Sequence, residues 1–182
     1  MLGYDLIETT SYWNVWYWIV NAVAWSMTAH WTMGVPYDAI RQADRKGGEF
    51  AEHCDLEAHI NARRLIYYFD RGGPYLIAFV GFMLALLGGW GFYQGYELAQ
   101  AIFLLATPLL FTSIFSVRLA YKIKDQALQG AELRAALRRR RIWNQFIGMI
   151  AIVIASIAAV YHYMVIYGYP APNGTFTPQH LL

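Results

Sequence analysis

Four long stretches of the sequence contain no aspartate, glutamate, lysine or arginine, namely 12–35, 74–93, 98–117 and 142–169. Each is long enough to cross a hydrocarbon layer of about 30 Å as a helix that rises about 1.5 Å per residue. Because these stretches lack carboxylates and amines, a proton relay built from such groups at membrane depth is excluded for this chain. Cysteine is also scarce. Cys54 is the only one, which excludes an internal disulfide.

Lysines and arginines are confined to the segments between these stretches. All 14 lysines and arginines fall within residues 41–71 and 118–141. In polytopic membrane proteins, basic side chains accumulate in the cytoplasmic loops. The pattern therefore predicts that residues 36–73 and 118–141 are cytoplasmic. Both termini, including the tail 170–182, are then expected on the other side.

Together these features predict an all-α integral membrane bundle of four transmembrane helices, N-out and C-out, with two basic cytoplasmic helical segments. We expect a single domain over residues 1–182, passing several times through a bacterial inner (cytoplasmic) membrane. Gly72-Gly73-Pro74 is expected to end the first cytoplasmic helix and to begin the second span. A break at Gln129-Gly130 is expected inside the second cytoplasmic segment.

Two histidines lie inside the apolar stretches and are candidates for cofactor binding. His30 is near the inner end of the first span and His162 near the outer end of the fourth. In that topology they are most of a membrane thickness apart, so they cannot share one haem iron. The alternative is that each forms hydrogen bonds at the membrane interface. No cofactor is identified by the sequence.

Residues 52–59 contain the densest set of metal-ligand types. On a helix, Glu52, Asp55 and His59 share one face at spacings that could hold a metal ion. No HExxH, paired ExxH or CxxC motif accompanies them. The alternative interpretation is a solvated helix face on which Asp55 pairs with His59.

Small residues recur every four positions in two of the apolar stretches. The two series are Gly81, Ala85 and Gly89 in the second stretch and Ala151, Ala155 and Ala159 in the fourth. Small residues at this spacing let helix backbones approach closely, which is how helices associate in lipid. Both series are therefore predicted to be helix-packing faces, and the alternative is that they face lipid.

A dense basic cluster precedes the fourth stretch. It comprises Arg134, Arg138, Arg139, Arg140 and Arg141. Lipids with anionic head groups attract such clusters by about 1 kcal/mol per basic residue. We expect it either to bind anionic lipid or only to fix the topology. Nucleic acid is not an expected partner.

These observations favour a non-catalytic accessory subunit of a multi-subunit inner-membrane complex for energy conversion or transport. Its expected partners are membrane lipids and other membrane subunits or copies of itself. A homo-oligomeric channel or transporter, with a pore lined by Asn21, Ser26 and Thr28, is the alternative. A membrane metalloenzyme that uses residues 52–59 is the third possibility.

Overall fold

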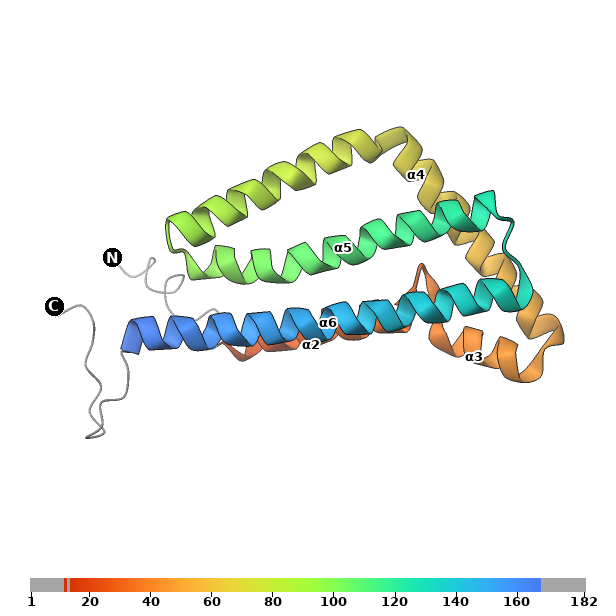
Figure 1. Ribbon diagram of the computed structural model, residues 1–182, viewed down its shortest axis with the longest axis horizontal. Coiled ribbons are helices and arrows are strands. Elements are labelled where there is room, and N and C mark those ends of the chain that lie inside the picture. Colours follow the sequence, from red (N-terminus) through yellow and green to blue (C-terminus); the bar gives the residue numbers. More distant parts are fainter. Residues whose placement is uncertain (1–11, 13, 168–182) are drawn as a thin grey trace.

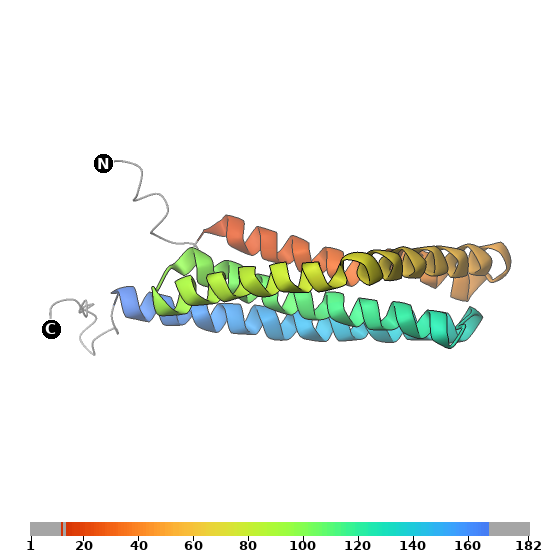
Figure 2. The same ribbon diagram turned by 90° about the horizontal axis from the view of Figure 1, so that it is seen from above.

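The computed structural model describes residue 12 and residues 14–167, which are almost entirely helical. The elements, in chain order, are α2 (Val15–His30), β1 (Trp31–Thr32), β2 (Val35–Pro36), α3 (Tyr37–Lys46), α4 (Gly48–Gly88), the π-helical η1 (Gly89–Tyr93), α5 (Glu97–Asp125) and α6 (Gly130–Tyr167) (Figure 1). Seen from above, the helices run lengthwise along the molecule (Figure 2). The start of α2, the turn before α5 and the end of α6 lie at one end, and α3 lies at the other.

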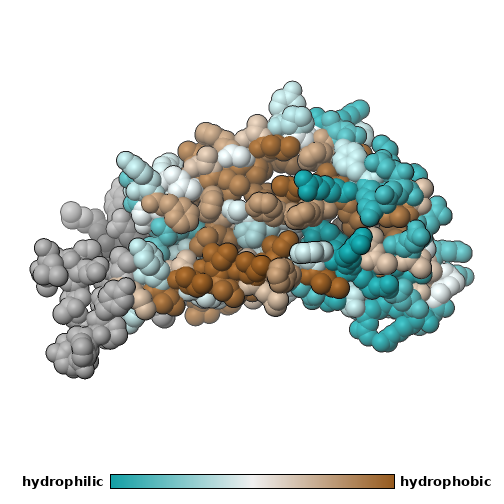
Figure 3. Space-filling view, in the orientation of Figure 1, coloured by the Kyte–Doolittle hydropathy of each residue, from teal (hydrophilic) through white to brown (hydrophobic). Residues whose placement is uncertain are grey.

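Polar surface gathers at the end that carries α3 and the turn between α5 and α6, whereas the middle of the molecule is apolar (Figure 3). Three helical segments, Gly48–Tyr93, Glu97–Asp125 and Gly130–Met164, are long and apolar enough to cross a membrane. This indicates a multi-pass membrane protein. The predicted count of four spans is not confirmed, because α2 has only 16 residues and is about 24 Å long. The orientation of the spans stays a prediction.

The sequence predicted that the first apolar stretch forms one helix up to residue 35. This prediction is wrong. Helix α2 ends at His30, and β1 and β2 then form a short antiparallel hairpin in which Thr32 faces Val35. Its two turn residues, Met33 and Gly34, have φ angles of 54° and 79°. Two successive positive φ values are characteristic of the tight type I′ turn, which matches the twist of a hairpin.

The prediction that Gly72-Gly73-Pro74 separates two helices is wrong. Helix α4 continues through all three residues, and Pro74 lies inside it. A proline inside a helix removes one backbone hydrogen bond and bends the helix without necessarily ending it. Figure 1 shows α4 strongly bent along its length. Gly73 is buried, and a Cβ atom there would lie 3.3 Å from the ring of Phe69.

The largest hydrophobic core lies at the polar end. Small and branched apolar side chains from the hairpin, α3, the first half of α4, the end of α5 and the start of α6 pack together there. Its fully enclosed members include Val35, Ile40, Cys54, Ala58, Ala120, Ile123, Leu133 and Leu137. The segments predicted to be cytoplasmic therefore fold as a helical unit with an apolar interior and a charged surface.

Helices α2 and α6 pack closely along an interface that we call the α2–α6 seam. It is formed by Trp25 and Thr28 of α2 and by Asn144 and Gly148 of α6. A Cβ atom at Gly148 would lie 2.7 Å from the Trp25 ring, so the indole lies directly on the glycine backbone. The Asn144 amide donates a hydrogen bond to the Thr28 carbonyl over 3.0 Å. The seam therefore combines a steric contact with a polar one.

Candidate functional site: a pocket between α4 and α5

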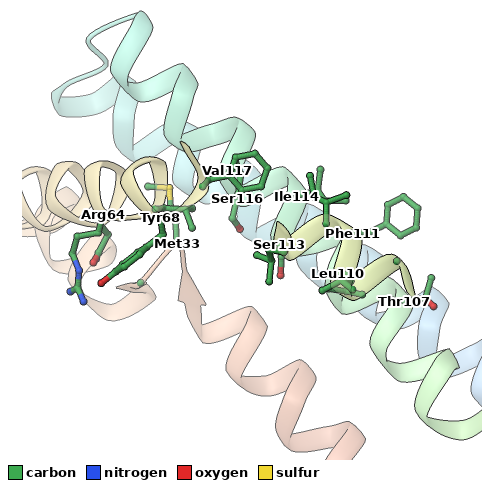
Figure 4. A pocket seen from close by; sticks show the side chains of 18 of the residues that line it. Met33, Arg64, Tyr68, Thr107, Leu110, Phe111, Ser113, Ile114, Ser116 and Val117 are labelled. Atoms are coloured by element: carbon green, nitrogen blue, oxygen red, sulfur yellow. The ribbon is translucent and has the colours of Figure 1, made fainter. Parts of the chain in front are cut away.

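Helices α4 and α5 enclose a pocket of about 740 Å³, which we call the α4–α5 pocket (Figure 4). This volume lies within the range of sites that bind small molecules, about 300–1,000 Å³. Its walls include Leu65, Phe69, Leu76, Ile77, Val80, Gly81 and Leu84 of α4 and Thr107, Leu110, Phe111, Ser113, Ile114, Ser116 and Val117 of α5. Most of these side chains are apolar.

The bend of α4 accounts for the position of the pocket. Lining residues come from α4 on both sides of Pro74. Near the turn between the two helices the backbones are close, because a Cβ atom at Gly91 would lie 2.8 Å from the Gln100 nitrogen. At Gly81, by contrast, a Cβ atom would meet nothing within 4 Å. The pair is therefore closed at the turn and separated beside the bend.

One end of the pocket is polar. Arg64, Tyr68 and Met33 lie there in Figure 4, and Asn61 and Gly34 also line the pocket. Arg64 is the only charged residue among the described residues that line it, and it forms no ion pair or hydrogen bond with any other described residue. An unpaired guanidinium beside an apolar chamber is suited to an anionic group.

A second arginine lies behind the same end of the pocket. Arg140 of α6 is only 6% exposed and donates a hydrogen bond to the Thr112 carbonyl. Its Nη2 lies 3.4 Å from Oγ of Ser116, which lines the pocket. Its Nε and Nη1 atoms are buried without a partner in the described part of the chain. The polar end is therefore positively charged on two sides.

The wall that α5 contributes to the pocket is apolar apart from three hydroxyls. Ser113 and Ser116 return hydrogen bonds to the carbonyls of Leu109 and Thr112 on their own helix. Thr107 Oγ1 is buried, and no described residue is its hydrogen-bond partner. Two of the three hydroxyls are thus satisfied locally, as is common for helices in lipid.

Ion pairs join two members of the predicted basic cluster to neighbouring helices. Arg134 contacts the carboxylates of Asp44 on α3, at 2.9 Å, and Asp55 on α4, at 3.5 Å. Arg138 pairs with Asp44 as well. Although partial burial raises it, hydrogen bonds from both arginines hold the pKa of Asp44 below its ordinary value. These two arginines hold α6 against α3 and α4.

Arg141 and Arg140 also have partners inside the chain. The Arg141 Nε donates to the Ala29 carbonyl at the end of α2 over 3.0 Å, and its guanidinium lies 3.5 Å from the centre of the Tyr37 ring. Of the five clustered arginines, Arg139 alone is exposed with no ion pair or hydrogen bond to the described residues. Whether the cluster binds anionic lipid stays a prediction.

The three candidate metal ligands do not converge on one site. Asp55 accepts a hydrogen bond of 2.6 Å from the backbone nitrogen of Gly130, so it caps the start of α6. Glu52 is exposed, and His59 Nε2 is buried without a partner among the described residues. Within residues 12 and 14–167, no group of three His, Cys, Asp or Glu side chains could hold a metal ion.

The two candidate histidines lie at opposite ends of helix α2, with His162 beside Tyr12 before its start and His30 at its last residue. His162 Nε2 is 2.6 Å from Oε1 of Gln100, near the start of α5, and its ring lies 5.4 Å from that of Tyr12. His30 is exposed at the end of α2, beside the Trp31 ring. The structure therefore gives His162 a hydrogen-bonding role, and the two imidazoles are too far apart to bind one metal.

The two series of small residues have opposite environments. Ala151, Ala155 and Ala159 are all buried within the chain, and Ala159 packs with Tyr12 and Ala101. Gly81, Ala85 and Gly89 are all exposed, and Gly81 also lies at the edge of the α4–α5 pocket.

Sequence reasoning did not find the α4–α5 pocket. The signal that could have indicated it is Gly72-Gly73-Pro74, interpreted as a bend in a continuous helix rather than as a boundary. Comparison of the chain with protein-family models, with curated proteins and with solved structures gives no match in any of the three.

Proposed function

We propose that the protein is a non-catalytic accessory subunit of a larger complex in a bacterial inner membrane, with its charged end in the cytoplasm. The observation that carries the proposal is the contrast between the two small-residue series. Ala151, Ala155 and Ala159 are covered by other helices of the same chain, whereas Gly81, Ala85 and Gly89 are exposed. The second series presents the same packing pattern to the outside.

Burial along the spans supports the same interpretation. In the most apolar window of each helical segment, 22% of residues are buried for α6 but only 6% for the segment that contains α4. In lipid, apolar side chains gain little from burial against one another, so close packing of small residues is a main source of helix association. We infer that a transmembrane helix of another subunit covers Ala85 and Gly89.

The geometry favours the two alternatives less. Asn21 is buried inside the chain, and Thr28 returns its hydroxyl hydrogen bond to the Ala24 carbonyl, so only Ser26 of the three suggested pore residues is exposed and without such a bond. A metalloenzyme centred on residues 52–59 would need Asp55, which already caps α6 and contacts Arg134.

Purification of the full-length protein from its native membrane in a mild detergent tests the proposal. Distinct polypeptides should co-purify in fixed ratio. Ala85→Leu and Gly89→Leu should weaken their retention, because the added side chains separate the two backbones. Ala22→Leu, at an exposed small residue of α2, is the matched control and should retain them.

Two results would contradict the proposal. One is isolation of a single polypeptide species that conducts ions in liposomes, which would establish the channel. The other is equal retention of partners by all three variants, which would show that the α4 face contacts lipid only.

A further inference from the structure

The geometry points to a binding site for an acidic membrane lipid in the α4–α5 pocket. Arg64 and Asn61 hold the anionic head group, and a hydrocarbon chain lies along the apolar walls formed by α4 and α5. Four of the five arginines that the sequence offered for lipid binding contact protein groups instead, whereas Arg64 has no partner among the described residues. This inference does not depend on the proposed accessory role.

The charges around the pocket favour an anion. No aspartate or glutamate is found among the described lining residues, and Arg64 lines the same polar end that Arg140 approaches from behind Ser116. Asp70, nine residues after Asn61 on α4, accepts a hydrogen bond from the Tyr121 hydroxyl. Hydrogen bonds between a guanidinium and a phosphate are charge-assisted and can be bidentate, which makes them stronger than neutral ones.

The length of the pocket matches one leaflet. Its wall on α5 extends from Val117 at the polar end to Thr107, and ten helical residues span about 15 Å. The hydrocarbon of one leaflet is half of a core of about 30 Å, which is also about 15 Å. An acyl chain whose head group is at Arg64 would therefore reach Thr107 near the middle of the bilayer.

The walls of the pocket are accessible from the side. Leu76, Ile77, Phe111 and Ile114 line it and are also largely exposed on the molecular surface. These residues lie in the apolar part of helices that can span a membrane. A lipid can therefore enter laterally from the bilayer, whereas a water-soluble anion would find almost no polar wall beyond the head-group end.

Lipid binding by the full-length protein in nanodiscs tests the site. The probes are phosphatidylglycerol and phosphatidylcholine, each carrying a photoreactive acyl chain, and the readouts are the bound fraction and the labelled peptides. Arg64→Gln should lower the affinity for phosphatidylglycerol about tenfold, which corresponds to about 1.4 kcal/mol. Arg63→Gln, the adjacent exposed arginine that does not line the pocket, should leave it unchanged. Arg64→Lys should retain part of the affinity.

Occlusion of the apolar part gives an independent readout. At Gly81 a Cβ atom meets open space, so Gly81→Phe should fill the chamber without disturbing the fold and should abolish labelling of residues 76–84. Ser113→Leu on the facing wall is a second occluding variant. The site is refuted if Arg63→Gln and Arg64→Gln have equal effects, or if phosphatidylcholine binds as well as phosphatidylglycerol. Labelling of the pocket walls that persists in both occluded variants, or cross-linking of those walls to a polypeptide, would also refute it.

Discussion

The α2–α6 seam and the α4–α5 pair use glycine in opposite ways. In the seam, Gly148 is covered by the Trp25 ring, and a Cβ atom would approach it to 2.7 Å. In the α4–α5 pair, Gly81 faces open space at the edge of the pocket. Both glycines lie inside long apolar helices, and nothing in their immediate sequence distinguishes them. The difference is whether a large side chain from another helix lies over the glycine.

This contrast distinguishes a helix pair that packs fully within the chain from a pair that leaves its surface open to other molecules. The seam is completed within the chain by Trp25 and Asn144, and the alanine series of α6 is also buried within the chain. The α4–α5 pair is closed at its turn, where Gly91 contacts Gln100, and separates toward the bend. The seam is therefore expected to govern stability, and the α4–α5 pair is expected to govern binding.

The same substitution at the two glycines should give the largest difference in stability between the two helix pairs. Gly148→Leu places a side chain where the Trp25 ring lies. It should destabilise the folded protein by about 3 kcal/mol or more, because α2 and α6 must move apart. Gly81→Leu should change stability by less than about 1 kcal/mol, because its Cβ meets no atom and glycine disfavours helices. Thermal unfolding of both variants in the same detergent measures the difference. Equal destabilisation would mean that the pocket is filled by protein.

The alanine series provides the next largest contrast. Ala155 is 1% exposed, so Ala155→Leu should destabilise the isolated protein by about 2 kcal/mol through overpacking. Ala85→Leu should leave the stability of the isolated protein unchanged and act only on partner retention. Unfolding midpoints compared with co-purification yields separate the two effects. A stability loss at Ala85 as large as that at Ala155 would place Ala85 inside the chain's own core.

A smaller effect is expected at the hairpin that closes the polar end of the pocket. Gly34→Ala forces a side chain into a φ of 79° and brings its Cβ to 2.8 Å from Nδ2 of Asn61. Gly95→Ala, also at a φ of 79° but in open space, is the matched control. The conformational cost is about 1 kcal/mol in both variants. Only Gly34→Ala should also weaken phosphatidylglycerol binding, because it displaces Asn61. Unchanged lipid affinity in this variant would show that the hairpin does not contribute to the lipid site.

The smallest expected effect concerns the ion pairs that hold α6 at the polar end. Because the folded pKa of Asp44 lies below its ordinary value of 3.8, its contribution is complete above that value and is lost as the pH falls through the folded pKa. The Asp44 side chain is about one-third exposed, which limits the contribution to about 0.5 kcal/mol. Unfolding measured from neutral to acid pH should therefore show that Asp44→Asn loses slightly less stability than the unmodified protein as the pH falls. Identical pH profiles would mean that water screens the pairs fully.

Several features of the fold could be predicted from local sequence. The absence of charge from residues 74–93 and 98–117 indicated apolar helices. The first stretch lies in α4 and η1, and the second lies in α5. Gln129-Gly130 indicated a break, and α6 begins at Gly130. The end of α2 at His30 was missed, since the hairpin depends on Met33 and Val35 reaching the core at the polar end. The pocket was missed because a bend and a boundary have the same local sequence signal.

By itself, the sequence determined that the apolar stretches are largely helical and which segments carry the charge, because both depend on the composition of contiguous residues. Only the tertiary structure decided which small residues are covered and which arginines are neutralised. Arg134 and Arg138 meet Asp44 across about ninety residues of chain, whereas Arg64 meets no acid in the described structure. The contribution of a charged side chain or a glycine to stability depends on the groups that it contacts. Helix packing decides these contacts, because it brings together residues that are far apart in the sequence.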